Sequence, residues 1–84
     1  MRVEFDNWES SLYGSAFILD IECLPRVGEE LFIHKTLFPE HYFTGVFTDQ
    51  PMQEEYDGLI KVEVSIVAHQ IDAKGHLPRV CFDV

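Results

Sequence analysis

The four histidines are the residues whose type and spacing could support metal chemistry. His34 and His41 are seven residues apart, and so are His69 and His76. Imidazole nitrogens ligate transition metal ions when several of them converge in a fold. The spacing matches no short metal-binding motif, and the strand pattern described below places His69 on an outer face and His76 in a turn. We therefore interpret the histidines as solvated surface side chains and expect no metal and no cofactor.

A catalytic nucleophile needs a serine or cysteine held beside a base, with hydrogen-bond donors for an oxyanion. No GxSxG motif occurs in the sequence. Neighbouring acids such as Glu54 and Glu55 identify no catalytic pair, because the chain has 15 acidic residues to choose from. Its glycines are isolated and do not form a phosphate-binding loop. We expect a protein that is not an enzyme.

The composition predicts one small folded domain over residues 1–84. Hydrophobic residues make up 46% of the chain, which is enough for a single core. Six basic residues against 15 acidic ones give a net charge of −9, which opposes contact with phosphate backbones and anionic membranes. The sequence shows no apolar run typical of a signal peptide or a transmembrane helix. We expect a cytoplasmic protein that does not contact membranes and for which nucleic acid is a disfavoured partner.

Alternating apolar and polar residues predict β-strands along most of the chain. A half-buried strand covers residues 15–23, and a second strand begins after a turn at 24–29. The aromatic and β-branched run 42–47 predicts a third strand, with a bulge or bend at Gly45. Residues 48–58 are polar and contain a proline and a glycine, so we expect a long loop there.

The clearest pattern in the sequence predicts a long strand over residues 59–71. Its core face is expected to carry five apolar side chains, namely Ile60, Val62, Val64, Ile66 and Ala68. A turn at 72–75 and a final strand over 77–84 complete a β-hairpin. A strand of this length must curve in so small a domain.

The N-terminal residues and the two cysteines each allow two interpretations. Residues 1–14 fit a short edge strand followed by a turn, although Asp6 or Asn7 is also suited to cap one turn of helix. Cys23 and Cys81 lie in apolar segments without metal-ligand spacing. We expect them to be reduced core residues, or a disulfide between strands in an oxidising compartment.

These elements predict an all-β fold, a small and strongly bent antiparallel sheet or barrel of about five strands. Such an arrangement, with a Gly-Glu turn before the second strand, resembles the SH3-like and Sm-like barrels. The first Sm motif ends in Asp-x-x-Met-Asn after a strand that contains glycine, and here Asp49-Gln50-Pro51-Met52-Gln53 follows the strand with Gly45. The second Sm motif is a basic residue and a glycine before the last strand, where this chain has Lys74 and Gly75.

Over about residues 13–84, the chain thus resembles an orphan bacterial protein with a variant Sm-like barrel. The resemblance implies assembly into a ring or dimer through strand edges, and RNA contact by Met52, Gln53, Lys74 and Gly75. Three hypotheses remain: a non-enzymatic module that self-associates or binds a protein partner, an Sm-like RNA-binding protein, and a small metal-using enzyme. We prefer the first, because the edges of an open sheet must be covered or paired.

Overall fold

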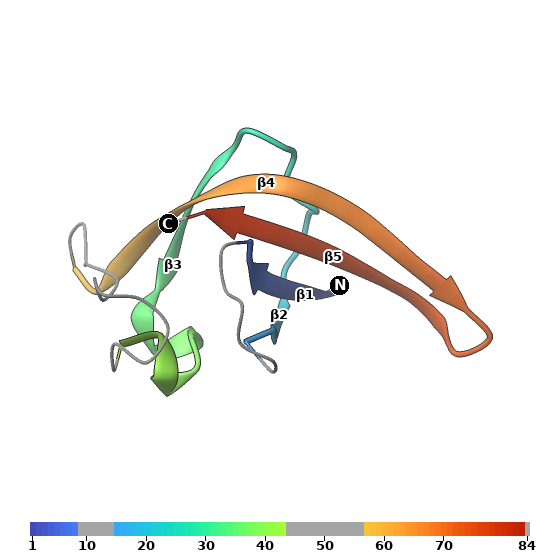
Figure 1. Cartoon of the computed structure of the whole chain (residues 1–84), viewed down its shortest axis with the longest axis horizontal. Coiled ribbons are helices and arrows are strands. Elements are labelled where there is room, and N and C mark those ends of the chain that lie inside the picture. The colour runs from blue at the N-terminus through green and yellow to red at the C-terminus, as the bar shows by residue number, and fades with distance from the viewer. Residues whose placement is uncertain (9–14, 44–56, 84) are drawn as a thin grey trace.

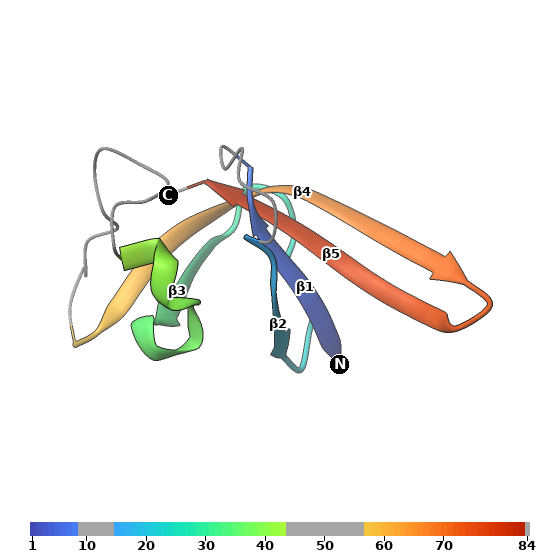
Figure 2. The same cartoon turned by 60° about the horizontal axis from the view of Figure 1, so that its bottom comes forward.

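The computed structural model describes residues 1–8, 15–43 and 57–83, and these residues form a curled all-β domain. Five strands make one mixed sheet in the order β2-β1-β5-β4-β3 (Figure 1). The strands are β1 (Arg2–Asn7), β2 (Phe17–Asp20), β3 (Glu30–His34), β4 (Leu59–Asp72) and β5 (Gly75–Asp83). The sheet curls into a half-barrel (Figure 2), which confirms the prediction of a small, strongly bent sheet.

The N-terminal strand β1 differs from its prediction in neighbour and direction. It lies between β2 and β5, so it is an inner strand and not an edge strand. It runs parallel to β5, with Phe5 opposite Val80, whereas the other three strand pairs are antiparallel as predicted. Val3 and Phe5 alternate along this strand and are both buried, but alternation carries no information about which strand lies alongside.

The core lies on the inner face of the curled sheet. Ten hydrophobic side chains are buried there: Val3, Phe5, Ile33, Phe38, Tyr42, Ile60, Val62, Val64, Val80 and Phe82. Phe17 joins the sheet to the segment after β3, because its ring packs against both Phe38 and Tyr42. Aromatic rings at these separations add to the stabilisation from buried area alone.

Two short 3₁₀ helices, η1 (Lys35–Leu37) and η2 (Glu40–Phe43), replace the start of the strand predicted over residues 42–47. The Tyr42 amide donates to the Pro39 carbonyl at 3.1 Å, which is the i to i+3 bond of a 3₁₀ turn. The turn carries Tyr42 into the core, so this aromatic residue is buried by a 3₁₀ turn and not by the predicted strand. The bulge predicted at Gly45 and most of the loop predicted over residues 48–58 lie outside the described residues.

A bulge in β4 changes which face its second half presents. Val64 lies opposite Phe82, the next pair is Ile66 with Cys81, and Ser65 is the extra residue between them. One additional residue moves every following side chain to the other face. Up to Val64 the predicted core face is correct, and beyond it the prediction is wrong.

Past the bulge, Val67 lies opposite the buried Val80 and packs against the core. Ala68 is exposed and Ile66 is only half-buried, so neither takes the core position that the sequence predicted. His69 falls on the same inner face as Val67 and not on the predicted outer face, because the side chains of a strand alternate between its faces.

Beyond the core, the β4–β5 hairpin continues as a two-stranded arm, which we define as residues 66–78. Strand β3 pairs with β4 only as far as Glu63, and β1 pairs with β5 only from Arg79 onward. The arm therefore projects from the rest of the sheet (Figure 1). Its turn follows Asp72 and ends at Gly75, as the sequence predicted.

Val64→Asp is expected to unfold the domain. Val64 is 1% exposed, and an unpaired carboxylate at that position costs more than the roughly 5 kcal/mol that a small domain has in reserve. Thermal unfolding followed by circular dichroism measures the loss. Ala68→Asp is the matched control, since the same charge on an exposed position of the same strand should leave the melting temperature within a few degrees of wild type. Wild-type stability of Val64→Asp would contradict the assignment of the core face.

Candidate functional site

The arm is the candidate functional site because its outer part carries a large apolar side chain, Ile71, outside the core. Ile71 is 76% exposed, the highest exposure among the large hydrophobic side chains of the described residues. Asp72 and Lys74 are the only charged residues between 66 and 78, so the arm has no net formal charge in a chain of net charge −9. An apolar and neutral projection from an acidic domain is suited to contact with another macromolecule.

The backbone of the arm is also suited to contact with another macromolecule. Within the described part of the chain, no strand pairs with the outer edge of β4 over 66–72 or with the outer edge of β5 over 75–78. Unpaired amide and carbonyl groups along a strand edge are a template for another strand. Natural edge strands are usually blunted by charges, prolines or bulges. Here the charged residues lie only near the tip, and Pro78 and the bulge at Ser65 lie at the base of the arm, so the open edge is β4 over residues 67–71.

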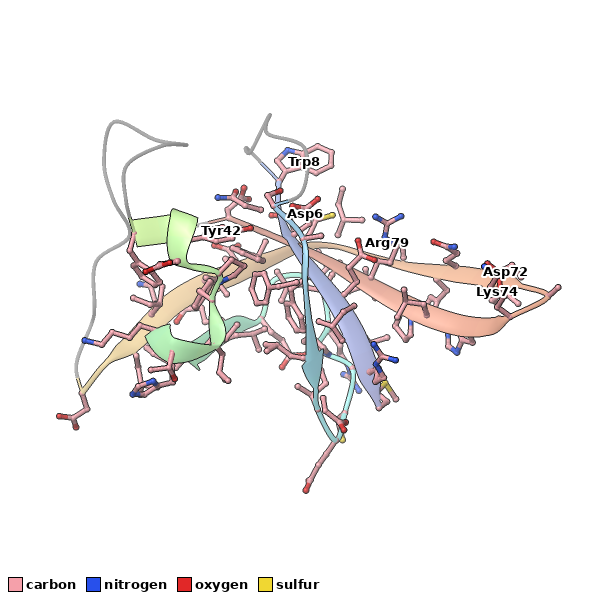
Figure 3. The ribbon with its side chains drawn as sticks, turned by 90° about the horizontal axis from the view of Figure 1, so that it is seen from below. Asp6, Trp8, Tyr42, Asp72, Lys74 and Arg79 are labelled. Carbon is pink, nitrogen blue, oxygen red and sulfur yellow. The ribbon has the colours of Figure 1, made fainter. Side chains whose placement is uncertain are left out.

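The tip of the arm is fixed by local hydrogen bonds (Figure 3). The Lys74 amide donates to Asp72 Oδ1 at 2.8 Å, and Gln70 Nε2 donates to Asp72 Oδ2 at 3.2 Å. These bonds, the Lys74 amide first, lower the pKa of the Asp72 carboxyl. Gly75 has a φ of +128°, which side-chain-bearing residues rarely adopt. The tip is therefore a defined turn that holds the two strands in register.

Two of the four residues implicated by the Sm resemblance, Lys74 and Gly75, lie at this tip. The other two, Met52 and Gln53, lie outside the described residues. A shared site for the four residues therefore stays a prediction.

His69 and His76 meet on the inner face of the arm. His69 Nδ1 and His76 Nε2 are 2.8 Å apart, and the rings stack with centroids at 5.0 Å and planes 25° apart. His69 lies opposite Pro78, and His76 lies opposite Ile71, so the two imidazoles are diagonal neighbours across the strands. Sequence reasoning missed this pair because it did not place the bulge. The signal was present in Ile66, Val67 and Ala68, three consecutive apolar residues that interrupt the alternation.

Of the other seven-residue pair, His34 and His41, the structure describes the contacts of His34 alone. His34 Nδ1 is 2.8 Å from Thr36 Oγ1, and the His34 ring lies over Gly58, where an added Cβ would come within 2.7 Å of it. The side chain of His41 is outside the described part of the structure. Within the described residues, no three histidine, cysteine or acidic side chains gather as metal ligands would.

A polar network of Asp6, Ser15 and Tyr42 joins three segments of the chain; Figure 3 labels Asp6 and Tyr42. Ser15 Oγ donates to Asp6 Oδ1 at 2.5 Å, and the Tyr42 hydroxyl donates to the Ser15 carbonyl at 2.5 Å. Ser15 and Tyr42 are both buried. Burial is the main cause of a raised pKa for the Tyr42 hydroxyl. The network connects β1, the segment just before β2, and η2. We therefore interpret it as a contact that stabilises the fold.

The two cysteines have different environments. Cys23 is exposed, which corrects the prediction of a core residue. The reason is that β2 ends at Asp20, so the predicted alternation through residue 23 does not form. Cys81 is half-buried on β5, where burial, followed by the charge of Asp6, raises the pKa of its thiol. The two thiols are not bonded to each other.

Raising the pH above about 9 is expected to destabilise the fold. The folded state raises the pKa of the Cys81 thiol above 9.0 and that of the Tyr42 hydroxyl above 10.0. Their protons are thus bound more tightly in the folded chain, so this stabilisation is complete below the unfolded pKa values and is lost as pH rises through the folded ones. Melting temperatures at about pH 8 and pH 11 should show a smaller decline for the double variant Tyr42→Phe, Cys81→Ala than for wild type. Equal declines would contradict this assignment.

None of the described residues forms a helix of the length and apolarity needed to cross a membrane. Comparison of the chain with family models, curated proteins and solved structures gives no match. The resemblance to Sm-like proteins therefore remains a prediction from the sequence.

Proposed function

We propose that this chain is a non-enzymatic interaction module whose arm docks against the arm of a second copy. The observation that carries the proposal is the pair of unpaired strand edges over residues 66–78. Strand addition at such an edge forms main-chain hydrogen bonds, and side-chain contacts on the two faces select the partner. The β4 part of the arm, six or seven residues long, spans roughly 20 Å, which is the length of an ordinary strand.

Charge favours a second copy as the occupant. Two chains that each carry a net charge of −9 repel one another over most of their surfaces. The arm is neutral, because Asp72 is balanced by Lys74. Contact between two arms therefore brings few like charges together. A two-fold arrangement also pairs each arm with an identical surface, as in most homodimers.

The exposed apolar surface of the arm favours docking, because docking removes it from water. Ile71 is 76% exposed in the single chain, and burying a side chain of this size contributes about 1.5–3 kcal/mol. In a two-fold dimer the residue is buried twice. The proposal includes the cytoplasmic location that the sequence predicts.

The RNA-binding alternative remains a prediction. The charge of −9 opposes phosphate binding, and Lys74 is the only basic residue among residues 66–78. No described contact favours RNA over a second copy of the chain.

Ile71→Lys is expected to weaken dimerisation by about 100-fold, since each of the two arms would place a charge in the contact, at about 1.4 kcal/mol or more each. Light scattering after size-exclusion chromatography, over a series of protein concentrations, measures the effect. Val27→Lys is the matched control, because Val27 is also an exposed hydrophobic residue, at 62%, but lies outside the arm.

Wild type and Val27→Lys should both elute as dimers that ignore a mixed pool of single-stranded RNA. A monomeric wild type at every concentration would contradict the proposal. A mass increase with RNA that weakens as salt rises would instead support the RNA-binding alternative.

A further inference from the structure

We propose that His69 and His76 form one half of a zinc-class metal site, and that the same two histidines of a second copy form the other half. This inference rests on the proposed docking of two arms. It assigns a ligand to the arm and gives the histidine pair a role that neither the fold nor the interaction module requires.

The geometry of the pair is close to that of two zinc ligands. His69 Nδ1 and His76 Nε2 point at each other from 2.8 Å. A tetrahedral zinc ion with zinc–nitrogen distances of about 2.0–2.1 Å separates two ligand nitrogens by about 3.3 Å. For an ion to bind both nitrogens, the nitrogens need to move apart by about 0.5 Å, each ring must turn so that its lone pair is directed at the ion, and the donor nitrogen must give up its proton. Each ring is attached to a different strand of the hairpin, and the register fixes both attachment points.

The surroundings leave the pair accessible to an ion. Both histidines are exposed, and each ring has the other as its hydrogen-bonding and stacking partner. His34 differs because its Nδ1 already contacts the Thr36 hydroxyl and accepts from the Thr36 amide. Two uncharged imidazoles suit zinc, copper or nickel, whereas magnesium and calcium prefer oxygen ligands.

Two ligands do not complete a structural zinc site, which takes four from protein. The described residues of one chain offer no third ligand beside the pair. A two-fold contact that also brings the inner faces of the two arms together presents the same pair twice and so supplies four imidazoles. A closed set of four ligands leaves no open position for substrate. The site would therefore stabilise the contact between two arms and would not be catalytic.

The test uses the full chain after treatment with a chelator. Zinc chloride is titrated by calorimetry, and the mass in solution is measured with and without zinc. We expect one zinc ion per two chains and dimerisation at least about tenfold tighter with zinc. His69→Gln should abolish both responses, and His34→Gln, the matched control, should keep both. Magnesium chloride should give neither.

Each outcome separates this inference from the proposed docking. Dimers that form without zinc and take up no zinc overturn the metal site and leave the docking proposal intact. Uptake of one ion per chain without a change in mass, or an undiminished response of His69→Gln, also overturns the shared site. A chain that is monomeric without zinc and dimeric with it supports the shared site and contradicts only metal-free docking.

Discussion

The bulge between Val64 and Ile66 is the feature on which the core and the arm both depend. The first half of β4 lies in the core, the second half forms one strand of the arm, and the bulge separates the two halves. In a regular strand, without the bulge at Ser65, Val64 and Val67 would fall on different faces. With it, Val64 and Val67 both face the core. The same shift brings His69 and Ile71 to the inner face of the arm. The composition of the core and the surface of the arm therefore depend on one irregularity in the ladder.

The parallel pairing of β1 with β5 makes the rest of the half-barrel possible. It places Phe5 and Val3 against the inner face, and β2 then pairs with the other side of β1. The hydrogen bonds from Ser15 to Asp6 and from Tyr42 to Ser15 connect β1 to η2. Because β1 reaches β5 only from Arg79 onward, the preceding residues of β5 are left as one edge of the arm.

Much of the fold follows from patterns in the sequence. Alternation predicted the inner positions of Ile60, Val62 and Val64, and turn-forming residues predicted the hairpin turn after Asp72. These features are local, and local chemistry determines them. The parallel pairing of β1 was not predictable, because no local pattern encodes the neighbour of a strand. The aromatic residue Tyr42 suggested a strand because burial in a 3₁₀ turn and burial in a strand select similar residue types.

The candidate site was harder to predict than the fold. Lys74 and Gly75 were singled out through a resemblance, and their place at the tip follows from the predicted hairpin. His69 contacts His76 only if both side chains lie on the same face of the hairpin. The extra residue at the bulge in β4 determines on which face His69 lies. The projection of the arm depends on where β1 and β3 stop pairing, which is a property of the whole sheet. Such features arise from long-range pairing and are absent from any short window of sequence.

Hydrogen exchange at two protein concentrations tests the central claim, that the arm is the surface through which two chains associate. Amides of β4 between 67 and 72 that face outward have no strand beside them among the described residues, whereas residues 60–63 pair with β3 over the core. The account predicts that raising the concentration by about 100-fold slows exchange in the arm and leaves the core amides unchanged. Arm amides that exchange at the same fast rate at both concentrations would contradict it.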